Sequence, residues 1–192
     1  MSAFLDGRKI VIGDYMREIT RRGMTGEMPF ADSLNARARA MGERMTLAEM
    51  EDICGNVKPR GGLGYALDVL TREGYDLAVV SGGIYPLVEA FTQSNGIQAD
   101  YMAASGITRL AGRISGVMPL TDKREVVNHF RNIGYRRIAA MGDGANDRSM
   151  KAAADLFVWI EPKPGMVETG DMVLSGNDLS LLPDILLNYR RK

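Results

Sequence analysis

Two segments of the chain share an order that few folds allow: a short apolar run, a loop containing glycine, and a helix. Residues 76–80 form the first apolar run, which is followed by a loop at 81–83 and a helical pattern from 85 to 93. Residues 137–141 precede a loop over 142–147 and a second helical pattern. Repeated strand, loop and helix units are typical of an α/β fold, in which a mainly parallel sheet carries helices on both faces.

The remaining segments fit the same class. We expect further elements in this order: a helix around 66–70, a hairpin or short strands over 101–116, a helix over 123–132, strands at 156–160 and 172–174, and a closing helix over 179–189. Residues 14–50 are polar, rich in Met and Arg, and helical in period, which indicates a small helical module. Pro and Gly at 59–62 are typical of a hinge. We therefore predict a helical module with the N-terminus over 1–58 and an α/β core over 59–192.

Charge and cysteine content narrow the class of partner. Lys plus Arg and Asp plus Glu both count 24, so the net charge is zero, and no long run of one sign suggests nucleic-acid binding. Cys54 is the single cysteine, which excludes an internal disulfide and a thiolate zinc cluster. The sequence holds no apolar stretch of the roughly eighteen residues that a membrane span needs. We expect a cytoplasmic protein that acts on small molecules and has no nucleic-acid or membrane partner. Its oligomeric state stays open.

The two loops carry residues suited to phosphate and metal chemistry. Ser81 and Gly82 offer a hydroxyl and an unhindered backbone N–H at the start of a helix, which suits phosphate oxygens, although a simple tight turn is the commoner meaning of such a loop. Asp143 and Asp147 flank glycines at a strand end, as a Mg²⁺ site requires, the alternative being a turn and a helix cap. Lys123 suits a bound phosphoryl group, or is a solvated lysine at a helix start.

These segments together resemble a known family. The segment 79–83 (VVSGG), Lys123 and the segment 141–150 (MGDGANDRSM) are similar, in order and spacing, to three of the four motifs of haloacid dehalogenase superfamily phosphatases, most closely the phosphoserine phosphatase group. Residues 18–37 resemble the helical cap of that group. The resemblance implies a Rossmann-like parallel sheet with a small helical cap.

The resemblance also implies roles for individual residues. In the core, Ser81 and the Gly82 N–H would hold phosphoryl oxygens, Lys123 would neutralise the phosphoryl charge, and Asp143 would ligate Mg²⁺. Asp147 would orient Lys123, and Asn146 would touch the substrate phosphate.

In the cap, Arg37 matches the residue that grips the substrate's carboxylate, with Phe30 and Met24 packed over the substrate. A guanidinium suits a carboxylate, but an arginine on a polar helix face is commonly just solvated.

The family's first motif, Asp-x-Asp-x-Thr/Val, supplies the nucleophile and the acid/base, and it is not found in this chain. Aligning the cap places that motif ahead of Met1. Asp6 and Asp14 stand in segments that only partly resemble it. The first strand would lie between the strands leading to Ser81 and Asp143, so that its absence would leave two inner edges unpaired. The chain is longer in its native form, or residues near 10–12 replace the strand, or the gene has decayed.

The expected function follows from the resemblance. It implies a Mg²⁺-dependent phosphomonoester hydrolase that forms an aspartyl-phosphate in its full-length form and acts on a small phosphorylated metabolite such as phosphoserine. Without a nucleophile, the chain as printed should be weakly active or inactive. The alternatives are a non-catalytic pseudo-phosphatase that binds a phosphorylated ligand for regulation, and a structural protein that works through a partner.

Overall fold

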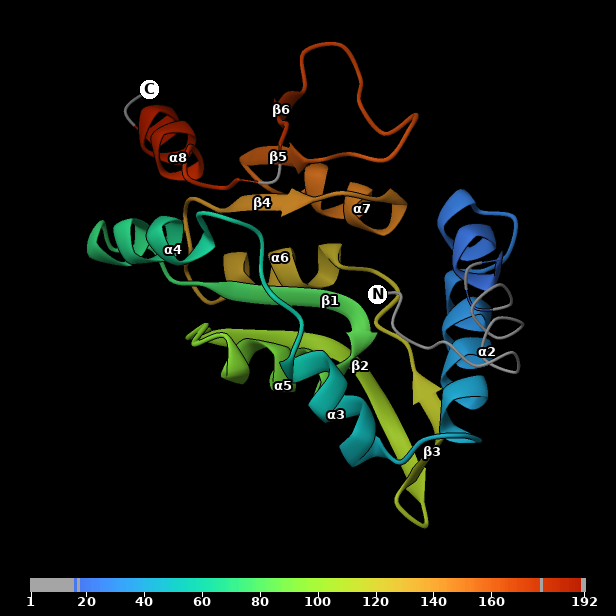
Figure 1. The fold of residues 1–192 in the computed structure, drawn as a ribbon. Helices are drawn as coiled ribbons and strands as arrows, with labels where there is room; N and C mark the ends of the chain where they lie inside the picture. The colour runs from blue at the N-terminus through green and yellow to red at the C-terminus, as the bar shows by residue number, and fades with distance from the viewer. Residues whose placement is uncertain (1–15, 17, 177, 191–192) are drawn as a thin grey trace.

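The computed structural model describes residues 16, 18–176 and 178–190 (Figure 1). Its strands form two three-stranded sheets, with the orders β1-β2-β3 and β4-β5-β6. The strands are β1 (Ala78–Ile84), β2 (Tyr101–Leu110), β3 (Arg113–Met118), β4 (Ala139–Gly142), β5 (Leu156–Ile160) and β6 (Met172–Leu174). The helices are α2 (Phe30–Gly42), α3 (Leu47–Gly55), α4 (Leu63–Arg72), α5 (Tyr85–Ser94), α6 (Arg124–Asn132), the 3₁₀ turn η1 (Ala145–Asp147), α7 (Arg148–Lys151) and α8 (Leu182–Arg190). A further helical segment covers residues 18–25. No helix among these described elements is long and apolar enough to cross a membrane.

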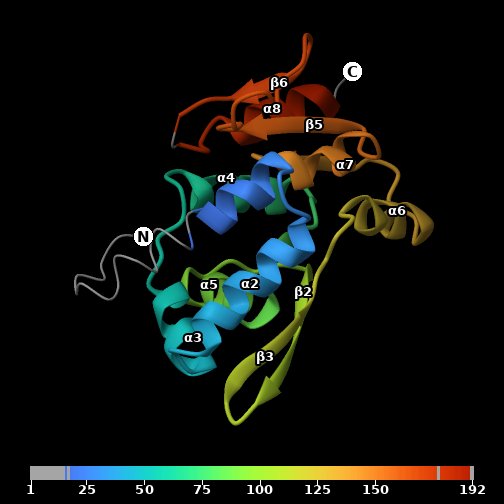
Figure 2. The same ribbon diagram turned by 90° about the vertical axis from the view of Figure 1, so that its right-hand side faces the viewer.

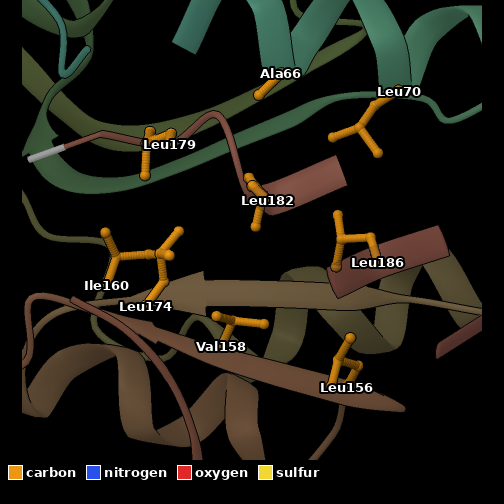
Figure 3. Packing of buried hydrophobic residues seen from close by; sticks show 9 residues of the cluster. All are labelled: Ala66, Leu70, Leu156, Val158, Ile160, Leu174, Leu179, Leu182 and Leu186. Atoms are coloured by element: carbon orange, nitrogen blue, oxygen red, sulfur yellow. The ribbon is translucent and has the colours of Figure 1, made fainter. Parts of the chain in front are cut away.

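The sheet β4-β5-β6 is parallel throughout and is covered on both faces. All residues of β5 are buried, and they alternate between two clusters. Val158 and its neighbours on one face pack against α4 and α8 (Figure 3), while Phe157 and Trp159 pack against α6 and α7. A strand buried on both faces needs apolar residues at every position, which is why 156–160 reads as an unbroken apolar run.

The other sheet combines a parallel and an antiparallel pair. β1 pairs with β2 in parallel, and β2 pairs with β3 as a hairpin, as the sequence predicted. Ala111 and Gly112 form the turn, both with positive φ (49° and 73°), which suits the right-handed twist of a hairpin. Ile114 of β3 shares a buried cluster with residues of α2 and α3. The hairpin therefore packs on the helical module, and the predicted boundary at residue 58 stays a prediction.

Within the described residues, no strand pair joins the two sheets. β1 pairs on one side with β2, and β4 pairs on one side with β5, so each presents an edge without a strand partner in that part of the chain. The sequence analysis expected the first strand of the family between these two edges, and residues 10–12, its candidate replacement, lie outside the described residues. The sheets are connected instead by side-chain packing, because Val80 of β1 packs against the cluster that contains Val127 of α6 and Phe157 of β5.

The structure differs from the sequence prediction at the end of the first strand. β1 continues through Ile84 and contains the segment 81–83, which we expected to be a loop. Its pairing with β2 shifts register between Val80 and Ile84, so this stretch is an irregular part of a strand. Sequence pattern places such an irregularity poorly, because the bulge is fixed by the pairing strand and not by local periodicity.

We predict that the α8 face of the core carries much of the stability. Leu182 is 2% exposed in the cluster around Val158, and the neighbouring Leu181 is 58% exposed. Leu182→Ala should lower the free energy of unfolding by about 2–5 kcal/mol because it leaves a cavity. Leu181→Ala should change it by less than about 0.5 kcal/mol. Urea denaturation curves measure both, and equal losses in the two variants would contradict the packing described.

Candidate functional site

The carboxyl ends of β1 and β4 point to the same side of the molecule, where α2 and the helical segment 18–25 lie (Figure 1). Seen from that side, these two helices stand in front of the sheets (Figure 2). Loops at the carboxyl ends of neighbouring parallel strands converge on one crevice, which is the usual ligand site of such sheets. The predicted core residues lie on this side.

A buried ion pair forms the base of the site. The Lys123 Nζ lies 2.6 Å from Asp147 Oδ1, and the two side chains are only 7% and 6% exposed. Lys123 directly precedes α6, and Asp147 ends the turn after β4, so the pair ties two separate strand–helix units together. A buried charge needs a partner, and each of these two residues supplies it for the other.

Asp147 also shapes the loop after β4. Its Oδ2 accepts hydrogen bonds from the backbone N–H groups of Asp143 (3.0 Å) and Gly144 (3.1 Å). The carboxylate of Asp147 is therefore fully used inside the protein, whereas the Asp143 side chain is half-exposed. The sequence analysis considered Asp143 and Asp147 together as flanking one site. In the structure, Asp147 holds the backbone of the loop, whereas the Asp143 carboxylate remains accessible.

The irregular end of β1, residues 81–83, meets the loop after β4. Gly83 N–H donates to Ser81 Oγ at 3.0 Å, and Gly82 is buried. A Cβ placed on Gly82 would lie 3.1 Å from Nδ2 of Asn146 and 2.6 Å from Cζ of Phe30. Asn146 and Phe30 therefore sit directly against the backbone of Gly82, and any side chain at residue 82 would force them apart.

Ser105 is a supporting residue that sequence reasoning missed. It is fully buried, its hydroxyl donates to the Gly82 carbonyl (3.0 Å), and its Oγ accepts the Leu120 N–H (3.0 Å). It thereby links the irregular end of β1 to the segment that leads to Lys123. No local signal marks this serine, because its partners are distant in sequence.

Two side chains of the helical module contact the backbone of the site. Phe30, at the start of α2, covers Gly82, and the Met24 methyl lies 2.7 Å from a Cβ placed on Gly144. The structure thus brings Met24 and Phe30 onto the two loops, next to the candidate phosphate-binding backbone. A side chain at either glycine would collide with the module.

Arg37 lies on the same side of α2 as Phe30, since the two are seven residues apart, about 10 Å along the axis. Its Nε donates to the Ser33 carbonyl at 3.3 Å, and burial lowers the pKa of its guanidinium. No ion pair between described residues involves Arg37. No described contact joins it to Ser81, Lys123 or the loop after β4, so its role stays a prediction.

Asp143 has the chemistry of one metal ligand. Mg²⁺ takes oxygen ligands and keeps several waters, so it is commonly held by one or two carboxylates and a substrate phosphate. The described part of the chain contains no group of three or more His, Cys, Asp or Glu side chains arranged for a metal. Asp143 therefore fits as one ligand of such an ion, and the described residues supply no complete set of protein ligands around it. Asp6 and Asp14, the two weak candidates for the nucleophile, lie outside the described residues.

Comparison with known proteins gives the same family on three grounds. Residues 5–151 match the model of the haloacid dehalogenase-like hydrolases. A phosphoserine phosphatase of Halobacterium salinarum is 30% identical over 87% of this chain and 82% of its own length. One of Archaeoglobus fulgidus is 29% identical over 94% of this chain, which spans only 55% of that protein. A substrate-bound phosphoserine phosphatase structure aligns with a TM-score of 0.79 and 26% identity, covering 95% of this chain and 87% of the other.

We predict that the buried ion pair has a much larger effect on stability than an exposed pair of equal length. Asp147→Asn would leave the Lys123 ammonium buried without its counter-charge, and should lower the free energy of unfolding by about 3–5 kcal/mol. The matched control is Asp68→Asn, which removes the exposed Asp68–Arg72 pair, also 2.6 Å, and should cost less than about 1 kcal/mol. Chemical denaturation measures the free energy of unfolding of both variants. Similar losses would show that the buried Lys123 ammonium does not need the Asp147 charge for stability.

Proposed function

Since the chain belongs to the family of haloacid dehalogenase-like hydrolases, we propose that it is a phosphomonoester hydrolase of the phosphoserine phosphatase type. The single observation that carries this proposal is the convergence of Gly82, Asn146 and the buried Lys123–Asp147 pair at the carboxyl ends of β1 and β4. Backbone N–H groups, an amide and an ammonium are the groups that bind phosphate in proteins. The predicted cytoplasmic location stays a prediction.

Each residue of this proposed site acts on a different part of the phosphate. The Ser81 hydroxyl and the Gly82 N–H would bind non-bridging oxygens, and Asn146 would donate its amide to another. Lys123, held by Asp147, would offset negative charge that builds up around phosphorus during transfer. Burial strengthens this effect, because a charge that is screened little by water interacts more strongly with its neighbours.

The covalent step needs a carboxylate that has no counterpart in the segments we describe. An Asp oxygen would form a bond to phosphorus while the bond from phosphorus to the substrate oxygen breaks, and an acid would give that oxygen its proton. Water would then hydrolyse the acyl phosphate, releasing inorganic phosphate and restoring the Asp. The place for such a carboxylate is the end of a strand docked between β1 and β4, whose facing edges lack strand partners in the described segments.

A divalent cation is part of the same proposal. Asp143 is the residue that would hold Mg²⁺, because its carboxylate is half-exposed beside the loop while that of Asp147 is already satisfied. Bound there, Mg²⁺ would supply positive charge to a phosphoryl oxygen.

The proposed substrate carries a carboxylate as well as a phosphate. Arg37 is half-buried without an acidic partner among the described side chains, on the helix whose first residue covers the phosphate loop. A guanidinium binds a carboxylate through two parallel hydrogen bonds, which favours a substrate such as phosphoserine.

We predict that hydrolysis depends on sequence beyond the described residues. If the gene encodes an Asp-x-Asp strand in frame before Met1, a chain extended to include it should release phosphate from phosphoserine with Mg²⁺, whereas the chain as printed should be weakly active or inactive. Lys123→Met in the extended chain should lower turnover by at least about a hundredfold.

The same assay separates the alternatives. Ligand-induced thermal stabilisation without hydrolysis in both chains would favour the non-catalytic pseudo-phosphatase. Turnover by the printed chain that survives Asp6→Asn and Asp14→Asn would contradict our account of the nucleophile.

We also predict that Arg37 sets the preference for a carboxylated substrate. Arg37→Met in the extended chain should raise the KM for phosphoserine by about 10- to 100-fold, since a hydrogen bond to a charged group contributes about 1.5–3 kcal/mol. The KM for p-nitrophenyl phosphate, which has no carboxylate, should stay unchanged. Arg39→Met, at an exposed position of the same helix, is the control. Equal effects on both substrates would remove Arg37 from the binding of the carboxylate.

A further inference from the structure

Lys163 lies at the edge of the site although no sequence motif pointed to it. Its Nζ is 3.5 Å from Asp143 Oδ2 and 3.5 Å from a Cβ placed on Gly144. Its backbone N–H donates to the Asp143 carbonyl at 2.9 Å. The residue therefore contacts Asp143 through both its backbone and its side chain.

The path of the chain after β5 holds Lys163 in this place. Glu161 has a φ of 46°, a left-handed conformation that costs energy for a residue other than glycine. It is held there by its N–H bond to the Leu174 carbonyl (3.1 Å) and by its carboxylate, which accepts the Gly176 N–H. The strained turn directs the chain back over the loop after β4, where Lys163 lies.

The residues on either side of Lys163 restrict it further. Pro162 and Pro164 fix their own φ angles, and Pro164 disfavours the right-handed helical conformation at Lys163, which precedes it. The following Gly165 carbonyl accepts a hydrogen bond from Arg148 at 3.2 Å. The backbone around Lys163 is thus restricted by two prolines and by hydrogen bonds, while its side chain is partly exposed.

The two carboxylates of the loop have one lysine each, in different surroundings. The Asp147–Lys123 pair is 2.6 Å long and buried, so breaking it would strand a charge away from water. The Asp143–Lys163 pair is 3.5 Å long, with side chains 49% and 43% exposed. An exposed pair of this length is weak, and water can solvate both partners when they separate. One pair is therefore permanent and the other is exchangeable.

We propose that Lys163 is a positioning residue that neutralises and holds the Asp143 carboxylate until a hard divalent cation replaces its ammonium. The assignment rests on the proposed function in one respect, namely that Asp143 is a cation ligand. A divalent ion on Asp143 and an ammonium a few ångströms away repel each other, so binding of the ion requires the Lys163 side chain to swing into solvent. Lys163 thereby sets how tightly the site binds its cation.

The test is direct measurement of cation binding with Mn²⁺ as the probe, using the electron paramagnetic resonance signal of the free ion. Lys163→Met removes the charge at similar length, and should tighten Mn²⁺ binding by about three- to tenfold. Lys163→Gln should act in the same direction, which guards against an effect of the apolar side chain. Lys163→Arg retains the charge and should stay within about twofold of the unmodified chain. Lys58→Met, an exposed lysine outside the site, is the control.

A second substitution shows whether the effect passes through Asp143. Asp143→Asn should weaken Mn²⁺ binding and should abolish the difference between the unmodified and Lys163→Met backgrounds. If Lys163→Met binds Mn²⁺ no more tightly than the unmodified chain while Asp143→Asn still weakens binding, the role of Lys163 is overturned and the proposed function stands. If the unmodified chain binds no Mn²⁺, both the role of Lys163 and the metal part of the proposed function fall.

Discussion

The buried contact between Lys123 and Asp147 is the interaction on which the arrangement of the site depends. It joins the start of α6 to the turn after β4, and through Asp147 it fixes the backbone of Asp143 and Gly144. Because both charges are removed from water, neither can move far without losing its partner. Asp147 therefore holds the loop after β4 in place, and Asp143 is the carboxylate of this loop that can exchange partners.

The rest of the site depends on how closely backbone segments approach one another. Gly82 and Gly144 have no side chain, so Phe30 and Met24 of the helical module reach the loops directly. Ser105 adds a second connection beneath Gly82 by bonding both its carbonyl and the Leu120 N–H. The backbone at Gly82 is thus contacted both by Phe30 of the helical module and by the buried Ser105.

The strands of the two sheets differ in how completely they are paired and covered. β5 is paired on both sides and covered on both faces, whereas the facing edges of β1 and β4 have no hydrogen-bonded strand partner in the part of the chain we describe. Backbone groups at such edges are stabilised when a strand pairs with them. The same position is where a nucleophile of this family is proposed to lie, so catalysis and stability would depend on one strand.

Sequence alone was sufficient for most of the elements and for the family. The apolar run at 156–160, the helix before Gly74 and the hairpin over 101–116 follow from local periodicity and turn chemistry, and the spacing of Ser81, Lys123 and Asp143 indicated the family. Only the tertiary structure decided that Lys163 faces Asp143, that Ser105 supports Gly82, that β1 continues through the expected loop, and that the described strands form two sheets. The physical reason is that periodicity reports which face of an element is buried, whereas contacts between distant segments depend on strand neighbours and chain path, which no local pattern encodes.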